Sequence, residues 1–199
     1  MIGRLKGLIV DKLEPGRFVI DVQGVGYDVE TSLNTFFALQ DEEKEIEIHI
    51  HTVVREDALL LYGFANRLER ALFRSLIRIN GVGPKLAISI LSSISPQDFI
   101  EVIQSGDTAS LVKLPGIGKK TAERLLIEMR DSIESIQLTP GSQSQMSHHH
   151  TNHKEEAISA LLALGYKNSE AKKAISQLDD GEKNSEQLIR QALQLISSR

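Results

Sequence analysis

Apolar and polar residues alternate with a period of two along most of residues 2–64, a pattern typical of β-strands with one buried face. The alternation is clearest in the stretch 46–51, where isoleucine alternates with glutamate and histidine. Turn-forming segments separate the runs, among them Glu14-Pro15-Gly16 and Arg55-Glu56-Asp57. About five strands within about 60 residues match a small barrel. The pattern therefore predicts an OB-fold β-barrel over residues 1–64.

The apolar spacing changes to three and four residues after Asn66, which is typical of amphipathic helices. Asn66 and Glu69 are spaced as a capping box, and Ser95-Pro96 and Gly106 mark the start and the end of a later helix. The pattern predicts an all-helical domain over residues 65–137. Four arginines recur every three or four positions on the first helix, and we expect most of them to belong to a solvated polar face: Arg67, Arg70, Arg74 and Arg78.

Residues 138–153 contain serine, glutamine and four histidines without apolar periodicity, and we predict a flexible linker there. We expect its histidines to be incidental rather than a metal site: His148, His149, His150 and His153. Helical periodicity returns over residues 154–199 in three short segments, with Asn168 and Asn184 as expected N-caps. Fewer than 50 residues build only a small core, so this module should be modestly stable alone.

The composition is that of an ordinary globular protein, with 41% hydrophobic and 25% charged residues. The absence of cysteine excludes disulfides, thiol catalysis and cysteine-based zinc sites. No apolar run approaches the roughly 20 residues that span a bilayer, and the N-terminus lacks a signal-peptide core. We therefore expect a cytoplasmic protein with no membrane partner.

The net charge of −4 is distributed unevenly along the chain. Residues 1–64 carry 6 Lys and Arg against 12 Asp and Glu, a net charge of −6. Residues 65–131 carry 10 against 7, a net charge of +3, and residues 132–199 carry 7 against 8, a net charge of −1. A basic middle region in an acidic chain is expected when that region faces phosphates and its neighbours do not.

A nine-residue segment from Ile79 to Ala87 recurs from Leu114 to Ala122, at a constant offset of 35 residues. In both copies a Gly-apolar-Gly turn precedes an amphipathic helix. The glycines let the backbone turn tightly and approach a ligand, and the free N–H groups at a helix start attract anions. Such contacts bind phosphates without reading base sequence. The candidate DNA-binding residues are Asn80, Gly81, Val82, Gly83, Lys85, Pro115, Gly116, Ile117, Gly118, Lys119 and Lys120.

Two glycine turns that merely connect helices are the alternative, and the duplication favours binding over it. The second copy is not a P-loop, because Gly118-Lys119-Lys120-Thr121 lacks the earlier glycine and the Gly-Lys-Thr ending. We therefore expect this chain to have no ATPase activity, no cofactor and no metal site.

The two turns resemble the paired helix-hairpin-helix motifs of the RuvA family, the Holliday-junction-binding subunits of bacterial branch-migration complexes. Further segments resemble the same family and occur in the order found there. They are Met1-Ile2-Gly3-Arg4-Leu5, Val53-Val54-Arg55-Glu56-Asp57-Ala58 followed by Leu61-Tyr62-Gly63-Phe64, and Leu164-Gly165-Tyr166. The resemblance covers nearly the whole chain apart from the linker.

This resemblance implies an α+β multidomain fold with an OB-fold barrel, a tandem helix-hairpin-helix domain and a C-terminal three-helix, UBA-like bundle. It implies a homotetramer that holds a four-way junction open in square-planar form, with a second tetramer able to close over the other face. The third domain would contact RuvB, the hexameric ATPase motor, and the RuvC resolvase is a further expected partner. The chain would be a non-catalytic subunit acting in recombination, DNA repair and the SOS response.

By the same resemblance, Glu56 and Asp57 match an acidic pin at the centre of the junction. Four copies of a doubly negative turn near a fourfold axis would repel phosphates and guide the strands apart. A solvated turn is the alternative, and a nuclease metal site has thin support from a single carboxylate pair. The candidates for the RuvB-facing surface are Leu161, Leu164 and Tyr166, with core packing as an equal alternative.

Two other functional classes remain open at this point. A glycosylase or structure-specific nuclease with helix-hairpin-helix motifs needs a catalytic acid or a metal cluster beyond the hairpin helix, where the chain offers only Glu128 and Asp131. A single-strand-binding protein would use aromatic platforms on the barrel. An aromatic content of 5%, the absence of tryptophan and the acidic barrel disfavour that use.

Overall fold

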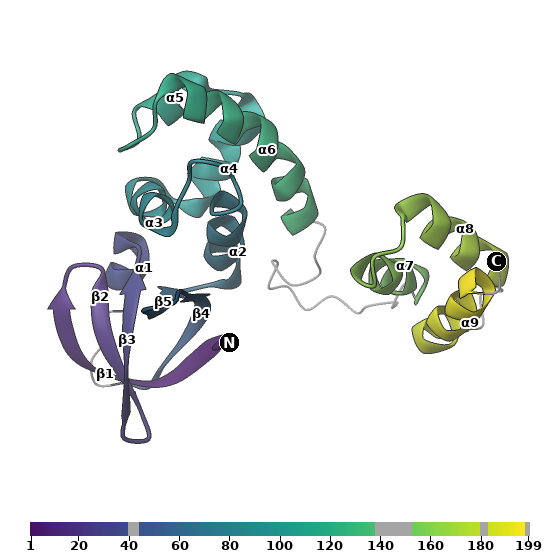
Figure 1. Ribbon diagram of the computed structural model, residues 1–199, viewed down its shortest axis with the longest axis horizontal. Coiled ribbons are helices and arrows are strands. Elements are labelled where there is room, and N and C mark those ends of the chain that lie inside the picture. The colour runs from purple at the N-terminus through teal and green to yellow at the C-terminus, as the bar shows by residue number, and fades with distance from the viewer. Residues whose placement is uncertain (40–43, 138–152, 180–182, 198–199) are drawn as a thin grey trace. The chain divides into compact units, whose positions relative to one another are not determined.

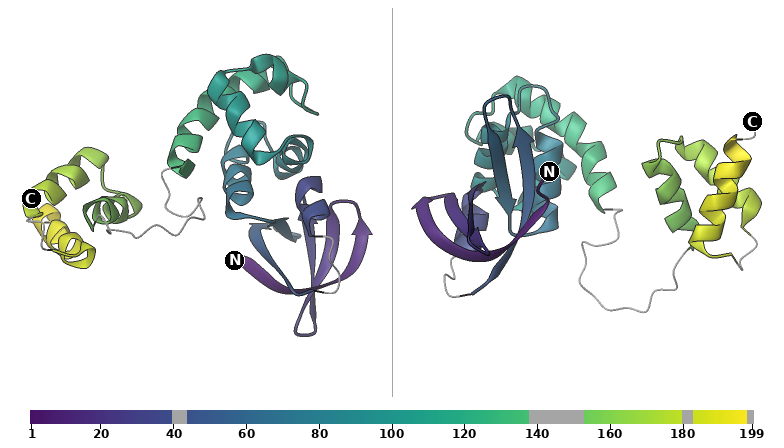
Figure 2. Two further views of the ribbon diagram at one scale, coloured as in Figure 1. Left: turned by 180° about the vertical axis from the view of Figure 1, so that it is seen from behind. Right: turned by 60° about the horizontal axis from the view of Figure 1, so that its bottom comes forward.

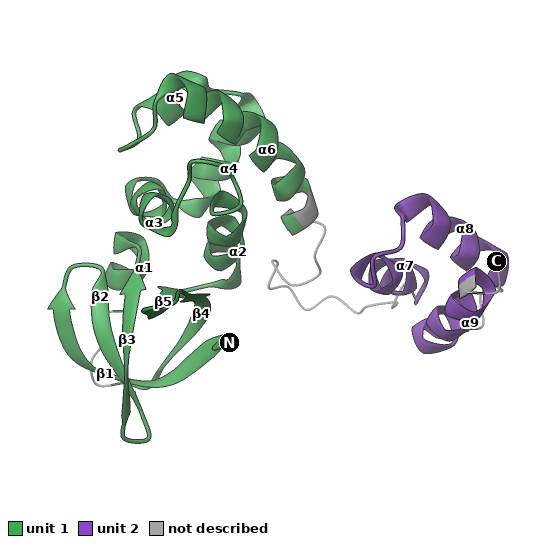
Figure 3. Ribbon diagram, in the orientation of Figure 1, with its two compact units in different colours: residues 1–144 green, residues 145–199 purple. Residues whose placement is uncertain are grey.

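The computed structural model describes residues 1–39, 44–137, 153–179 and 183–197. The chain divides into two compact units, residues 1–144 and residues 145–199 (Figures 1 and 3). The expected linker at 138–153 lies outside the described residues except for His153, and so do His148, His149 and His150.

The first unit begins with a closed five-stranded barrel, as the period-two alternation predicts. Its elements are β1 (Arg4–Glu14), β2 (Arg17–Val22), β3 (Val25–Thr31), α1 (Leu33–Ala38), β4 (Ile46–Val54) and β5 (Leu59–Phe64). The strand order around the barrel is β1-β2-β3-β5-β4, and only β3 and β5 pair in parallel. The inward-facing apolar residues of the strands fill the barrel, with Phe18, Ile20 and Ile48 fully buried.

Strand β1 closes the barrel because it pairs with two neighbours. Its first half pairs with β4, from Arg4 opposite His49 to Gly7 opposite Ile46, and its second half pairs with β2. A Cβ atom at Gly7 would lie 2.0 Å from the backbone oxygen of Asp21, so only glycine fits where the strand passes from one partner to the other.

Five helices complete this unit, as the helical periodicity over residues 65–137 predicts. They are α2 (Arg67–Leu76), α3 (Pro84–Ser93), α4 (Pro96–Ser105), α5 (Thr108–Val112) and α6 (Lys119–Gln137). The Ser95 hydroxyl accepts the Asp98 N–H at the start of α4, and Gly106 ends that helix with φ of +74°. Tyr62 and Phe64 of β5 lie in the same hydrophobic cluster as the helices, so the barrel and the helices share a core.

Glu69 joins the first turn of α2 to α1. The Asn66 side chain accepts the Glu69 N–H at 2.9 Å, which is half of the expected capping box. The Glu69 carboxylate does not complete that box. It is buried and instead accepts hydrogen bonds from the Ser32 hydroxyl and, at 2.5 Å, from the Thr35 hydroxyl. The barrel and the helical part are thus fastened by a buried polar cluster.

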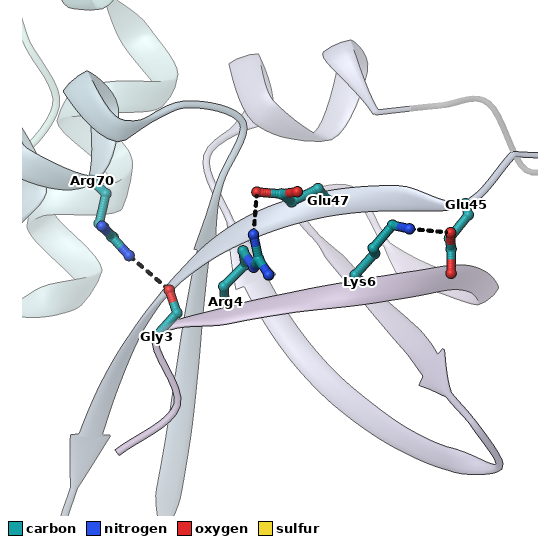
Figure 4. Close-up of polar contacts among 6 residues, drawn as sticks. All are labelled: Gly3, Arg4, Lys6, Glu45, Glu47 and Arg70. Carbon is teal, nitrogen blue, oxygen red and sulfur yellow. Dashed lines mark hydrogen bonds and ion pairs between the residues drawn. The ribbon is translucent and has the colours of Figure 1, made fainter. Parts of the chain in front are cut away.

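The arginines of α2 face the barrel more closely than the sequence suggests. Arg70 is half-buried and donates to the backbone oxygen of Gly3 at 2.7 Å (Figure 4). This arginine is therefore an exception to the solvated face that we expect for most of the four. Arg74 stays exposed but donates to His51 Nδ1 at 3.2 Å. Burial and, after it, the Arg74 and Arg70 charges lower the pKa of His51.

Two ion pairs on the outer surface also join β1 to β4 and to Glu45, the residue before β4 (Figure 4). Arg4 pairs with Glu47 at 3.2 Å, and Lys6 pairs with Glu45 at 2.7 Å. Because all four side chains are exposed, water and salt screen both pairs and each contributes little to stability. Closure of the barrel therefore depends on its core rather than on these charges.

The second unit consists of α7 (His153–Ala163), α8 (Asn168–Leu178) and α9 (Ser185–Ser197). Its core is small, as its length predicts, and is formed by Ala157, Leu161, Ala171, Ala174, Ile175, Leu188 and Ala192. Asn184 is confirmed as an N-cap, because its side chain accepts the Gln187 N–H at 2.9 Å. Asn168 is instead the first residue of α8, and Lys167 occupies the cap position.

Candidate nucleic-acid interface

The first repeated turn connects α2 to α3. Gly81 has φ of +90°, a conformation in which a side chain is strained. The Val82 N–H donates to the Ile79 oxygen at 2.9 Å, and the Val82 side chain is buried in the helical core. Gly83 is the N-cap of α3 and offers no side chain, while Pro84 supplies the fixed φ that suits a first helical position. The backbone N–H groups that follow are left for an external acceptor.

The second turn connects α5 to α6 with the same backbone arrangement. Gly116 has φ of +76°, and the Ile117 N–H donates to the Leu114 oxygen at 3.2 Å. The Ala122 N–H donates to the Gly118 oxygen at 2.9 Å, as the Ala87 N–H does to the Gly83 oxygen at 3.0 Å in the first copy. The sequence repeat is therefore a structural repeat.

The repeat combines buried anchors with exposed glycines. Ile117 is buried like Val82, so the side chains of these two candidates face the core and only their backbone faces outward. Gly83 and Gly118 are exposed, and a Cβ built on either meets no atom within 4 Å. At each turn the open side of the backbone is thus available for close approach by a ligand.

Contacts across the repeat hold the two turns together. Arg124 of α6 donates to the backbone oxygen of Asn80 in the first turn at 2.7 Å. In return, Gly116 of the second turn packs so closely on Leu86 of α3 that a Cβ would lie 2.9 Å from its Cδ1 atom. Sequence reasoning missed Arg124. No local signal marks it, because Arg124 lies beyond the end of the repeat and its partner Asn80 is 44 residues away in the sequence.

The charge beside both turns is positive. Lys85, Lys119 and Lys120 lie in the first turns of α3 and α6 and are exposed. Within the described part of the chain, none of the three forms an ion pair with an acidic side chain, so their charges are not offset by a direct partner. Together with the partial positive charge of each helix N-terminus, they favour anions at both turns. Asn80 and Pro115 are exposed at the matching position of each turn.

The acidic turn lies at the tip of the β4–β5 hairpin. The Arg55 N–H donates to the Ala58 oxygen at 2.8 Å and closes the turn, which leaves Glu56 and Asp57 exposed at the tip. In the right-hand view of Figure 2 this dark-blue hairpin stands beside the helices of the same unit. The structure therefore presents an acidic tip and two basic turns on one compact unit.

The three candidates in the second unit lie in different environments. Leu161 is fully buried in the core of that unit, which agrees with the core-packing alternative. Leu164 is 61% exposed, and Tyr166 is half-buried and packs against the core. Gly165, with φ of +93°, ends α7 between them. Of these three candidates, only Leu164 and Tyr166 are accessible at the surface of the unit.

No group of three or more His, Cys, Asp or Glu in the described ranges is placed to hold a metal ion. Among the same residues, no single helix is long and apolar enough to cross a membrane. Helices α3 and α4 reach that length and composition only when taken together, across a bend of 96°.

Comparison with known proteins identifies relatives along the full chain. Residues 1–63 match the RuvA N-terminal domain, residues 73–131 match the SAM-like helix-hairpin-helix tandem, and residues 152–197 match the RuvA C-terminal domain. The chain is 60% identical over 199 residues to the Holliday junction branch migration complex subunit RuvA of Legionella pneumophila strain Corby, with 100% of both chains covered. It is 48% identical to that of Marinobacter nauticus, with 97% of both chains covered. The Stutzerimonas stutzeri protein of the same name is 44% identical, with 97% of this chain and 98% of that one covered.

Proposed function

Because the chain belongs to the RuvA family, we propose that it is the non-catalytic DNA-binding subunit of a Holliday junction branch migration complex. It binds four-way junctions, holds them open in square-planar form and brings the RuvB ATPase to them. The observation that carries this proposal is the duplicated turn, because the two copies have the same backbone hydrogen bonds and are held together by Arg124 and Gly116.

The two turns act as a phosphate grip. Exposed Gly83 and Gly118 let a DNA backbone approach the N-termini of α3 and α6, where free N–H groups donate to phosphate oxygens. Lys85, Lys119 and Lys120 add charge that is not specific to sequence. A subunit that must accept any junction sequence needs this kind of contact, since phosphate contacts carry no direct base information.

The acidic turn acts at the crossover. In a tetramer, four copies of Glu56 and Asp57 near the fourfold axis place eight carboxylates where the strands exchange. They repel the phosphates there while the basic turns attract the arms farther out, and this combination favours an open junction over a stacked one. No bond is made or broken, so the subunit guides strands and leaves the energy input to the motor.

The second unit recruits the motor. Leu164 is exposed and Tyr166 lies beside it along the chain, so these two present apolar surface to RuvB, whereas Leu161 supports them from the core. Within this proposal, residues 1–64 and 65–137 bind the junction, residues 138–153 link, and residues 154–199 bind RuvB. The tetramer works in the cytoplasm in recombination and repair, with RuvC and a second tetramer as further partners.

A gel-shift titration of a synthetic four-way junction against a linear duplex of equal length tests the proposal. Both are titrated in moderate salt with magnesium, and native mass spectrometry counts the subunits in each complex. We expect a strong preference for the junction and a multiple of four subunits. Equal affinity for both DNAs would reject the assignment and leave a general duplex-binding protein.

A further inference from the structure

Two large apolar side chains flank the acidic turn and are exposed to solvent. Val54, the last residue of β4, is 67% exposed, and Leu59, the first residue of β5, is 59% exposed. The two lie directly opposite each other in the hairpin, so they form one apolar surface at the base of the turn. We call them the apolar pair.

The neighbouring pairs of the same hairpin are covered. Val53 and Leu60, one step farther from the turn, pack against the helical core. Thr52 and Leu61, one step beyond, are buried in the barrel. The apolar pair therefore lies on the same side of the hairpin as the barrel core but beyond the end of the barrel. Two large apolar residues side by side at the tip of a projecting hairpin suit contact with another molecule better than solvent.

The charge of the hairpin tip restricts which chemical groups of another molecule can contact the apolar pair. Arg55, Glu56 and Asp57 give the turn a net charge of −1, and both carboxylates are exposed, so a phosphate group is repelled. A nucleobase is uncharged and has an apolar face, and its amino groups can donate to the carboxylates beside it. The faces of separated bases thus complement an apolar surface with an acidic rim.

A second copy of the chain fits this surface less well. Two side chains expose far less area than the roughly 800 Å² that each partner buries in a standard interface. The bases at a junction crossover need no such large area.

We propose that Val54 and Leu59 form an apolar wedge that contacts the nucleobases at the crossover point of the junction, an inference that rests on the proposed function. The carboxylates exclude the phosphates, and the apolar pair supplies a surface for bases that have left one duplex and not yet entered the next. Apolar side chains that enter base steps act in this way in other DNA-binding proteins. The wedge reads no sequence, because every base has an apolar face.

The full-length double variant Val54→Thr with Leu59→Gln tests this inference. Both changes keep the approximate size of exposed side chains, so folding is little affected. The probe is a four-way junction with 2-aminopurine at the crossover, whose fluorescence rises when the base loses its stacking neighbours. Fluorescence is read at saturating protein, so that a change in affinity does not enter. The matched control is Leu8→Gln with Val10→Thr, because these residues of β1 are also exposed on the barrel but distant in sequence from the turn.

We expect the wild-type protein and the control variant to raise the fluorescence equally, and the Val54–Leu59 variant to lose at least half of the increase. A full increase in that variant would overturn the wedge. A changed subunit number, read by native mass spectrometry, would also overturn it by showing that the pair contacts a second copy. Failure of the proposed function is distinguishable, because the wild-type protein would then show no preference for the junction over a duplex.

Discussion

Gly118→Ala should separate DNA binding from folding. The φ angle of Gly118 lies outside the left-handed region, and a Cβ built there meets nothing within 4 Å. The added methyl group should therefore leave the stability of the protein nearly unchanged. It projects instead from the exposed backbone where we place a phosphate. Loss of one hydrogen bond to a charged group costs about 1.5–3 kcal/mol, which corresponds to a roughly 10- to 150-fold weaker phosphate contact at this turn.

Gly116→Ala supplies the contrast, only two residues away. Its φ of +76° strains any side chain, and its Cβ would lie 2.9 Å from Leu86 Cδ1. A cost of about 1–2 kcal/mol lowers the melting temperature of a unit of this size by roughly 3–8 °C.

Thermal unfolding and junction titration of both variants check these expectations. Gly118→Ala should melt like the wild type and bind weakly, whereas Gly116→Ala should melt early. Wild-type affinity in Gly118→Ala would refute the phosphate site at this turn. An equal loss of melting temperature in the two variants would refute the geometric reasoning.

Three further outcomes follow from the proposed function. Lys119→Glu with Lys120→Glu should weaken junction binding. It should also reduce the slope of log affinity against log salt concentration by up to about 2 per subunit, because fewer counterions are released. An unchanged slope in the titration would show that these lysines do not contact the DNA. Glu56→Gln with Asp57→Asn should leave junction affinity unchanged or make it tighter, and should alter the rate of branch migration in a strand-exchange assay. A large loss of affinity would mean that these two residues have a structural role. Deletion of residues 154–199 should preserve junction binding and abolish RuvB-driven branch migration, since these residues belong to the second compact unit. Retained branch migration would reject the proposal that this unit binds RuvB.

The features that follow from local periodicity were predictable from the sequence. The alternation around Ile46 to Ile50 and the helical spacing after Asn66 predict the barrel and the helices, because each pattern reports which side of an element is buried. The repeat at an offset of 35 predicts the two turns, and their identical backbone hydrogen bonds confirm that they are equivalent. These properties are encoded within a few residues of one another.

The features that depend on distant partners were not predictable. Local sequence predicts a capping box for Glu69 and an exposed side chain for Arg70. In the folded protein Glu69 instead accepts a hydrogen bond from Ser32, and Arg70 donates to Gly3, because folding of the barrel brings these distant residues close. The same reason hides the Arg124 contact with Asn80. The spacing of apolar residues shows that the last segment is helical, but it does not show which leucines are buried in the small core. The structure shows that Leu161 is one of them.

The contacts that the sequence hides also bear on how the proposed function works. A junction is held open only if the acidic tip keeps a fixed position relative to the basic turns, because repulsion at the crossover must coincide with attraction along the arms. The sheet-to-helix core through Phe64, the buried carboxylate of Glu69 and the Arg70 contact with Gly3 fasten the barrel that carries the tip to the helices that carry the turns. The residues that we propose to bind the motor need no such fixed position, and they lie in a separate compact unit with its own core. Under the proposed function, the division of the chain into two units follows the division between holding DNA and recruiting the motor.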